Sequence, residues 1–365
     1  MIMHIVGNRP QFIKLAPVSK EIRKRGYRQV IIHTGQHYDA NMSDVFFEEL
    51  GIAKPDQNLA IGSGTHAEMT GKAMIAIEKV LMEYWPKCVI LYGDTDSTLA
   101  GAIATVKMEI PIVHIEAGIR TNSLKNPEET NRIVTDHLSQ ILFCSDQDSV
   151  KNLKMEGITK GVYHVGDVMY DTFLQYKSLG NGTAQTRSGL EKKEYILMTW
   201  HRKENTQDKN RMLQIIRFLE KVKYQIVYPM HPRTKAKLIE YNLLGELEQI
   251  PHIHILPPIG YTEMMDLMVN AHMVLTDSGG VSKESFFAGV KCVLMVDLDL
   301  WPDLIKKHWI IKLDVDSEKS IAQVMDFMST KTDHIPHSLE GIYGNGIASV
   351  KIADILEEQY KLKKE

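Results

Sequence analysis

Short, continuous runs of apolar residues recur along the chain, separated by stretches with helical periodicity. A strand with one solvent-facing side alternates apolar and polar residues, whereas a continuous apolar run indicates a strand buried on both faces of a parallel sheet. The runs form two series, at 1–7, 29–35, 87–93, 111–118 and 140–146, and at 194–200, 224–229, 252–258, 272–279 and 291–297. This repeated alternation of strand and helix predicts an α/β fold with two doubly wound parallel sheets.

Two domains are expected from this pattern. The 365 residues suffice for two α/β domains of roughly 170 residues each. We place the N-terminal domain at 1–170 and the C-terminal domain at 171–348, and the Gly-, Ser- and Thr-rich segment 179–189 is the best linker candidate. The final segment, 349–365, has helical periodicity and a basic end.

Charge and cysteine usage exclude several classes of protein. A net charge of -3 gives no bulk attraction to nucleic acid or to an anionic membrane. The N-terminal apolar run is too short for a signal peptide, and no run approaches the ~18 apolar residues of a membrane span. The three cysteines stand far apart in apolar runs, which argues against a disulfide framework or a zinc site. We therefore expect a cytoplasmic protein that binds neither nucleic acid nor membrane.

The segment TDSGGVSKES at 276–285 is the strongest candidate for a phosphate site. Ligands of doubly wound sheets bind beyond the carboxyl ends of the strands, and this segment follows an apolar run and opens a helix. Asp277 and Ser278 are predicted to cap the helix, and the two glycines that follow let a diphosphate approach free amides at the positive helix end. Glu284, in the first turns, is placed to accept from ribose hydroxyls; a plain capped turn is the alternative. The candidate binding residues are Ser278, Gly279, Gly280 and Glu284.

Two basic residues follow the first apolar run, in GNRPQFIK at 7–14. The segment lacks the G-x-G-x-x-G pattern of a dinucleotide-binding turn. Arg9 and Lys14 could nevertheless both face a phosphate, with solvated surface charges as the alternative.

Carboxylates follow two runs that are expected to be neighbouring strands. Asp94 comes at the end of one run and Glu116 at the end of the next, while Glu128 and Glu129 follow with Arg132 beyond them. A carboxylate at the mouth of a buried strand is costly unless it is paired. Three such acids near an arginine could shift one another's pKa values enough for one to act as a base near neutrality. Helix capping by Asp94, Glu128 or Glu129 and a surface ion network are the alternatives.

Histidines also follow strand-like runs. His201 stands directly after the run 194–200 and His231 after the run 224–229, so both are candidates for a ligand site. The pair His33 and His37 suggests a metal site, but no H-E-x-x-H motif or cysteine partner accompanies it, and no metal is expected. Tyr261 either flanks a nucleobase or packs in the core.

Eight segments in a fixed order resemble the non-hydrolysing UDP-N-acetylglucosamine 2-epimerase family over nearly the whole chain. These segments are GNRPQFIKLAPV, HTGQHYD, LYGDTDST, HIEAGIRT, PEETNR, WHRKEN, YPMHPR and TDSGGVSKE. The resemblance implies a GT-B-like pair of Rossmann-type domains with an active-site cleft between them. It also implies that the helix at 349–365 packs back on the first domain, that the C-terminal domain binds UDP, and that the protein is a homodimer.

The resemblance assigns roles to individual positions. The acid/base carboxylates correspond to Asp94, Glu116 and Glu128, and the family's catalytic histidine corresponds to His201. The UDP-binding positions correspond to Arg9, Ser278, Gly279, Gly280 and Glu284, and other polar positions of the site correspond to Lys14, Arg132 and His231. The implied reaction removes the C2 proton of a UDP-linked 2-acetamido sugar with anti loss of UDP. UDP then adds back to the 2-acetamidoglycal, which is protonated from the opposite face, and no cofactor is needed.

The chain departs from the common family pattern at several positions. Asn8 and Gln11 stand where the common form reads G-T-R-P-E, Trp301 stands where the enterobacterial type has an arginine, and Met264 occupies a position that is often aromatic. RPQFIK and ANMSDVFFEELGI are closer to the branch of UDP-2,3-diacetamido-2,3-dideoxy-glucuronate 2-epimerases. Three further functions compete with these two: a GT-B glycosyltransferase, a hydrolysing epimerase that releases UDP, and a non-catalytic sugar-nucleotide-binding regulator.

Overall fold

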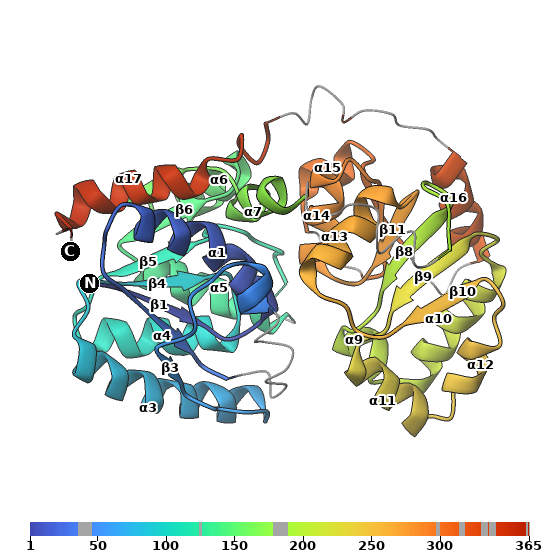
Figure 1. Cartoon of the computed structure of the whole chain (residues 1–365), viewed down its shortest axis with the longest axis horizontal. Helices are drawn as coiled ribbons and strands as arrows, with labels where there is room; N and C mark the ends of the chain where they lie inside the picture. Colours follow the sequence, from blue (N-terminus) through green and yellow to red (C-terminus); the bar gives the residue numbers. More distant parts are fainter. Residues whose placement is uncertain are drawn as a thin grey trace. The chain divides into compact units, whose positions relative to one another are not determined.

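The chain folds into two compact units, unit 1 (1–174 together with 341–365) and unit 2 (175–340). The boundaries expected from the sequence are 170/171 and 348/349, four and eight residues from these. The computed structural model describes residues 1–35, 46–123, 126–177, 189–296, 300–313, 318–329, 335, 341–362 and 364. Most of the linker candidate at 179–189 therefore lies outside the described residues. Each unit is an α/β structure with its own sheet (Figure 1).

Unit 1 contains a seven-stranded sheet among its described residues, in the order β3-β2-β1-β4-β5-β6-β7, and all neighbouring strands run parallel. Its strands are β1 (Ile2–Val6), β2 (Gln29–His33), β3 (Gln57–Asn58), β4 (Cys88–Tyr92), β5 (Ile112–Ile115), β6 (Ile141–Cys144) and β7 (Val162–His164). Its helices are α1 (Arg9–Lys24), α3 (His66–Tyr84), α4 (Asp96–Lys107), α5 (Pro127–Leu138), α6 (Gln147–Met155), α7 (Val168–Tyr176, which crosses the boundary) and α17 (Ala348–Tyr360).

Unit 2 contains a six-stranded sheet among its described residues, in the order β10-β9-β8-β11-β12-β13, again with parallel pairing throughout. Its strands are β8 (Tyr195–Thr199), β9 (Gln225–Pro229), β10 (Ile253–Leu256), β11 (Met273–Thr276), β12 (Cys292–Leu294) and β13 (Ile310–Lys312). Its helices are α9 (Lys203–Thr206), α10 (Lys209–Lys221), α11 (Pro232–Glu240), α12 (Leu244–Glu248), α13 (Tyr261–Asn270), α14 (Gly279–Phe287), α15 (Pro302–Lys306) and α16 (Glu318–Ser329).

Both sheets reverse their winding direction at one point. In unit 1 the reversal lies between the adjacent strands β1 and β4, and in unit 2 between β8 and β11. The turns that follow the carboxyl ends of such strands diverge to opposite faces of the sheet, which opens a crevice where ligands of doubly wound sheets bind. The topology therefore predicts ligand-binding residues after β1 and β4 in unit 1 and after β8 and β11 in unit 2.

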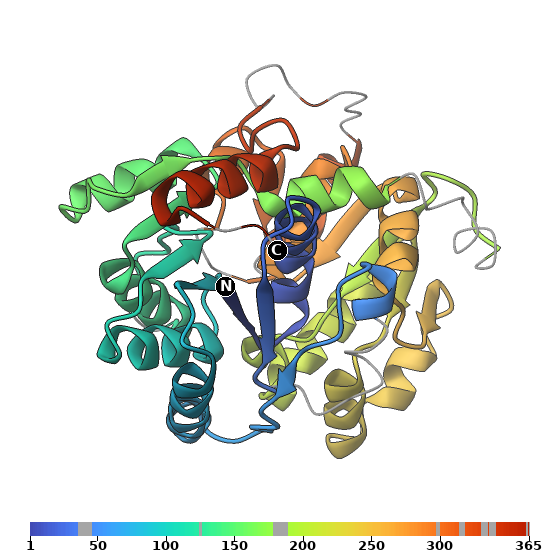
Figure 2. The same ribbon diagram turned by 60° about the vertical axis from the view of Figure 1, so that its left-hand side comes forward.

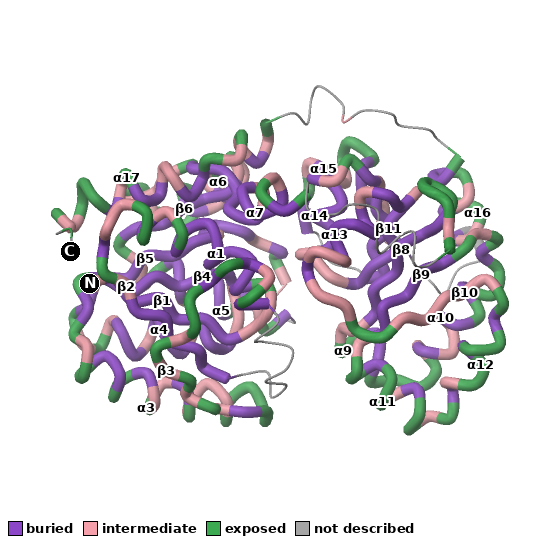
Figure 3. Tube along the Cα trace, viewed as in Figure 1, coloured by how far each residue is buried: buried purple, intermediate pink, exposed green. Residues whose placement is uncertain are grey.

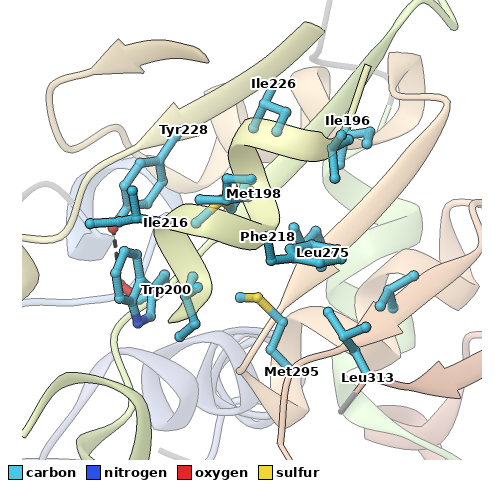
Figure 4. Close-up of a cluster of buried hydrophobic side chains, with 14 of the residues drawn as sticks. Ile196, Met198, Trp200, Ile216, Phe218, Ile226, Tyr228, Leu275, Met295 and Leu313 are labelled. Atoms are coloured by element: carbon cyan, nitrogen blue, oxygen red, sulfur yellow. Dashed lines mark hydrogen bonds between the residues drawn. The ribbon is translucent and has the colours of Figure 1, made fainter. Parts of the chain in front are cut away.

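Continuous apolar runs form buried strands in both sheets, as the sequence predicts, except at the edge strand β10, which is half-buried (Figure 3). In unit 2, side chains of β8, β9 and β11 pack against α10 in one apolar cluster (Figure 4). The hydroxyl of the buried Tyr228 has a hydrogen-bond partner within this cluster, since its Oη donates to the Trp200 carbonyl over 3.2 Å. Burial of such large side chains supplies most of the driving force for folding.

The last helix of the chain belongs to unit 1, where α17 packs beside α1 (Figure 2). Asp171 on α7 caps it from a distance in sequence, because its carboxylate accepts from the Ala348 and Ser349 amides at 3.0 and 2.7 Å. Arg25 at the end of α1 forms ion pairs with Asp354 and Glu357 of α17.

Within the described residues, no helix combines the length and the apolar composition that crossing a bilayer requires.

Candidate active site

Lys14 and Glu116 form an ion pair at the carboxyl edge of the unit 1 sheet. The Lys14 Nζ lies 2.5 Å from Glu116 Oε1, and both side chains are at most one-tenth exposed. Gly93 passes directly beside the pair, since a Cβ there would lie 2.9 Å from Lys14 Nζ. The alternative interpretation of Lys14 as a solvated surface charge is therefore wrong.

Asp94 and Arg132 form a second ion pair at the same edge. Arg132 donates to Asp94 Oδ2 from Nε at 2.9 Å and from Nη2 at 2.6 Å. Asp94 Oδ1 has no hydrogen-bond partner among the described residues, and the side chain is one-quarter exposed. The N-cap of α4 is Thr95, so Asp94 does not cap that helix. Arg132 therefore fixes the Asp94 carboxylate through Oδ2 and leaves Oδ1 available for another contact.

Arg132 also contacts Glu129, through Nη1 and Oε2 at 2.7 Å. Burial alone would lower the pKa of Arg132, but the charges of Asp94 and Glu129 outweigh it and raise that pKa above its ordinary value. The Glu129 carboxylate is fully engaged, because it also accepts from the Thr121 amide and hydroxyl and from the Asn122 amide. Glu129 therefore ties a loop to α5.

Glu128, the neighbouring candidate, is half-buried in the first turn of α5. The N-cap of this helix is Asn126, whose side chain accepts from the Glu128 amide at 3.3 Å. The capping alternative is thus wrong for Glu128 as well, and its carboxylate remains a candidate for chemistry.

Glu116 has an uncommon backbone conformation, with φ at +71°. Non-glycine residues rarely adopt this left-handed region, and strain of this kind clusters at functional sites. Hydrogen bonds from the Glu116 and Ala117 amides to the Phe143 carbonyl, both 3.1 Å, fix the turn. From this turn the side chain of Glu116 reaches Lys14.

Arg9 begins α1, directly after the cap residue Asn8. Its guanidinium lies 4.9 Å from the centre of the Phe46 ring, and the residue is half-buried. Gln11, in the same turn, is 1% exposed; it accepts from the Gly7 amide at 2.6 Å and donates to the Tyr92 carbonyl at 2.7 Å. This side-chain amide joins the ends of β1 and β4, and a glutamate could not donate the second bond.

His114 is a functional candidate that the sequence alone does not single out. It lies within β5, fully buried, with Nδ1 2.7 Å from Asp136 Oδ1 and Nε2 2.7 Å from the Gly93 carbonyl oxygen. Asp136 also accepts from Arg120 at 2.7 Å and from the Gly118 amide at 3.0 Å. A polar residue in an otherwise apolar run is the only signal for His114 in the sequence.

In unit 2 the turn after β11 opens α14. Ser278 is the N-cap and accepts from the Val281 amide at 3.4 Å; the glycines at 279 and 280 form the first turn and are partly accessible. Amides of a first helical turn have no intrahelical acceptor, so this turn can bind an anion. Trp301 closes one side, donating from Nε1 to the Gly279 carbonyl at 3.1 Å.

Asp277 does not cap α14, contrary to the sequence-based expectation. Because β11 lies beside β8, its fully buried carboxylate reaches the turn after β8 and accepts from the His201 and Arg202 amides at 2.9 and 2.8 Å. His201 Nδ1 lies 3.7 Å from the same carboxylate, and its ring lies 5.6 Å from that of His231, centre to centre. His231 is the N-cap of α11, where its Nδ1 accepts from the Arg233 amide.

The remaining unit 2 candidates are more deeply enclosed. Glu284 is 1% exposed on α14, and the neighbouring Lys283 is fully buried with its Nζ 4.1 Å from the centre of the Trp301 ring. Tyr261 is fully buried and packs edge-on against Tyr176, the position of a core side chain. Contact between Tyr261 and a nucleobase stays a prediction.

The structure groups the candidates by unit. Unit 1 brings Lys14, Asp94, Glu116 and Arg132 to one edge of its sheet, and unit 2 brings together His201, His231 and the start of α14. His37 lies outside the described residues, so the pair that it forms with His33 in the sequence is not tested.

Comparisons with known proteins give a consistent picture. The profile of the UDP-N-acetylglucosamine 2-epimerase family matches residues 20–357. The chain is 43% identical to a UDP-N-acetylglucosamine 2-epimerase homolog of Methanococcus maripaludis, over 97% of this chain and 99% of the relative. It is 41% identical to the UDP-2,3-diacetamido-2,3-dideoxy-D-glucuronate 2-epimerase of Pseudomonas aeruginosa, over the same shares.

A solved structure extends the likeness to three dimensions. The Methanocaldococcus jannaschii UDP-GlcNAc 2-epimerase, in complex with UDP-GlcNAc and UDP, superposes with a TM-score of 0.91 and 37% identity, over 98% of this chain and 99% of that one. The expected GT-B-like pair of Rossmann-type domains is confirmed. On the match of its sequence, of its two sheets and of its motifs, the chain belongs to the UDP-N-acetylglucosamine 2-epimerase family.

Proposed function

We propose that this protein is a non-hydrolysing epimerase that interconverts UDP-N-acetylglucosamine (UDP-GlcNAc) and UDP-N-acetylmannosamine (UDP-ManNAc). The observation that carries the proposal is the pair of carboxylates after the adjacent strands β4 and β5, each held by its own cation. The likeness to a solved epimerase that binds UDP-GlcNAc and UDP supports the substrate.

We assign proton transfer to the carboxylates of unit 1. One of Asp94, Glu116 and Glu128 takes the C2 proton while the bond between C1 and the UDP oxygen breaks, which leaves 2-acetamidoglycal and UDP. UDP then attacks C1, and a second group gives a proton to C2 from the opposite face. The open Oδ1 of Asp94 supports its part in this exchange, since Oδ2 is occupied by Arg132.

We assign UDP binding to the turn after β11. Arg9 is a further UDP-binding residue in this assignment. The first-turn amides at Gly279 and Gly280 suit a diphosphate, and Glu284, one turn further along, suits the ribose hydroxyls. UDP must be held between leaving and returning, so its binding groups stabilise the leaving group and prevent its escape. His201 and His231, at the ends of the neighbouring strands β8 and β9, complete the proposed polar set.

Incubation with UDP-GlcNAc in D2O tests the reaction. Deuterium at C2 in both epimers, with UDP-ManNAc appearing and no free UDP accumulating, is the expected result by NMR. Free UDP forming in step with product would favour a hydrolysing epimerase. A protein that exchanges C2 of neither UDP-GlcNAc nor the diacetamido uronate is not an epimerase of this kind.

The alternative substrate is a UDP-2,3-diacetamido-2,3-dideoxy-glucuronate in surface polysaccharide synthesis. The 41% identity with the Pseudomonas aeruginosa epimerase named for that sugar favours it. Exchange at C2 of the diacetamido uronate without exchange in UDP-GlcNAc would move the assignment to this sugar.

We further propose a cytoplasmic homodimer. All three cysteines are buried without disulfides, which fits a reducing compartment. The helix α3 exposes Ile75, Met82 and the following Trp85, each more than half accessible, and apolar side chains of this kind are typical of subunit interfaces. Sedimentation velocity of the wild type and of Ile75→Lys tests the dimer; a wild type that sediments as a monomer contradicts it.

A further inference from the structure

His114 carries protons on both ring nitrogens, as its hydrogen bonds require. Nε2 lies 2.7 Å from the Gly93 carbonyl oxygen, which can only accept, so Nε2 is a donor. Nδ1 lies 2.7 Å from Asp136 Oδ1, while Oδ2 of that carboxylate accepts from Arg120 and from the Gly118 amide. An ionised carboxylate also only accepts, so Nδ1 is a donor too.

The state of Asp136 supports this assignment. Burial alone would raise the pKa of Asp136, but the hydrogen bonds and charges of His114 and Arg120 outweigh it and hold that pKa below its ordinary value. His114 is therefore an imidazolium, and neither it nor the Asp136 side chain is exposed to solvent. A buried charge pair is weak evidence for stability, so its placement calls for another reason.

The imidazolium holds the residue that precedes Asp94. Gly93 is fixed on both sides by β5, because its amide donates to the Ile115 carbonyl at 3.0 Å and its carbonyl accepts from His114. With φ at +60° and Lys14 beside it, Gly93 makes the turn that directs Asp94 out of β4.

The same pair also reaches the turn that carries Glu116. Asp136 Oδ2 accepts from the Gly118 amide, two residues after Glu116, where φ is +82°. One buried charge pair thus contacts both turns from which the candidate proton-transfer groups extend.

We propose that His114 is a positioning residue for epimerisation, which sets the direction of Asp94 through the Gly93 carbonyl and, with Asp136, fixes the turn of Glu116. The proposal rests on the proposed function, since it concerns the geometry of the proton-transfer groups. His114 itself touches neither substrate nor reacting atoms.

Two substitutions of His114 separate positioning from mere packing. The amide nitrogen of glutamine comes near the position of Nε2, so His114→Gln can still donate to the Gly93 carbonyl. The amide nitrogen of asparagine comes near Nδ1, so His114→Asn can donate to Asp136 but loses the Gly93 contact. Both remove the ring. Because asparagine is one methylene shorter than glutamine, a role in packing alone predicts the same difference between the two variants at His114 as at an equally buried control position.

We expect kcat of His114→Asn to fall about 100-fold below that of His114→Gln, because small misplacements of reacting groups cost about this much. KM should stay within about threefold of the wild type in both, since the substrate-binding groups are untouched. His4 is the control, because it is equally buried in the same sheet but is hydrogen-bonded to Tyr92 Oη. The His4→Gln and His4→Asn variants should not differ in kcat. Equal kcat losses in the two His114 variants, or a change confined to KM, overturns the proposal.

A measurement on the wild type keeps the proposal testable if the variants do not fold. NMR of protein labelled with 15N-histidine should show a proton on His114 Nε2, because donation to the Gly93 carbonyl requires one; an Nε2 without a proton overturns the proposal. The two hypotheses fail differently. A wild type without C2 exchange contradicts the proposed function, whereas an active wild type whose two His114 variants lose turnover equally contradicts only the positioning role.

Discussion

Each of two candidate carboxylates in unit 1 is held by a different cation, Asp94 by Arg132 and Glu116 by Lys14. Because β4 and β5 are adjacent and parallel, these carboxylates leave the sheet at the same edge. Like charges brought together at one edge would repel, and the two cations offset that repulsion. They also fix the orientation of each carboxylate, which proton transfer to one carbon requires.

Neutral isosteres of these carboxylates should separate chemistry from binding. Asp94→Asn and Glu116→Gln keep the side-chain shape but cannot take a proton, so turnover should fall by about 10²–10⁴-fold, the usual share of a general acid or base. UDP affinity by calorimetry should stay close to that of the wild type. Arg9→Ala should instead weaken UDP binding. If the two isosteres lose UDP binding, these acids are structural.

His4 makes the stability of the protein depend on pH. Burial lowers its pKa to about 4, whereas the unfolded value is 6.5. The unfolded state therefore binds the proton first, and stability that is fully present above pH 6.5 is lost as the pH falls towards 4, by about 3 kcal/mol. Urea unfolding of the wild type and of His4→Asn across this range measures it. The variant should lose less stability on acidification, and parallel curves would contradict the assignment.

At the scale of elements, the sequence predicts the strands with continuous apolar runs. All ten predicted runs form strands, from β1 to β12. Nine of these strands are mostly buried, as a continuous apolar run predicts, whereas the edge strand β10 is only half-buried. The strands that the sequence pattern does not predict, β3, β7 and β13, have two or three residues each, too few for a periodicity to be detected.

The candidate site can be predicted only in part, because a local sequence pattern marks some of its residues and not others. A residue that follows a buried strand can be found from its place in the sequence, as Asp94, Glu116 and His201 show. His114 lies inside a strand, and its role depends on Asp136 from another element. Asp277 looks like a cap, but the neighbouring strand decides what its carboxylate contacts. Partners that come from distant parts of the chain leave no local pattern.

The turn after β5 should tolerate no side chain at Gly118. A Cβ there would overlap the Ser149 carbonyl oxygen, and φ is +82°. Gly26 has a similar φ of +77° but open space around it, so Gly26→Ala should cost only the left-handed strain of about 1–2 kcal/mol. Gly118→Ala should cost about 1–3 kcal/mol more, by urea unfolding. Equal costs would mean that the turn relaxes around the methyl group.

On the scale of the whole molecule, the chain leaves unit 1 after Leu174 and returns to it at Gly341. Within unit 1, the segment just before the chain leaves is hydrogen-bonded to the segment just after it returns. Asp167 donates its amide to the Tyr343 carbonyl at 2.9 Å, and Asp171 caps the helix α17 that follows the return. The GT-B-like architecture is therefore built from one continuous unit inserted into a discontinuous one.

Removal of the Asp171 cap should loosen the return segment. Asp171→Ala leaves the Ala348 and Ser349 amides without their acceptor, and a lost cap costs about 0.5–2 kcal/mol. Hydrogen exchange followed by mass spectrometry should show faster exchange in α17. Asp146→Ala, which removes the cap of α6, is the matched control and should affect α6 alone. Unchanged exchange in α17 would show that its packing on α1 suffices.

The discontinuity of unit 1 has a consequence for biosynthesis. While the ribosome makes residues 175–340, α1 lacks the helix α17, which packs beside it in the complete unit and in which Ile352 and Leu356 are fully buried. A nascent chain therefore completes unit 2 before unit 1, although unit 1 begins first. Chaperones that recognise exposed apolar helices would meet this protein through α1, during the interval in which unit 2 is being translated.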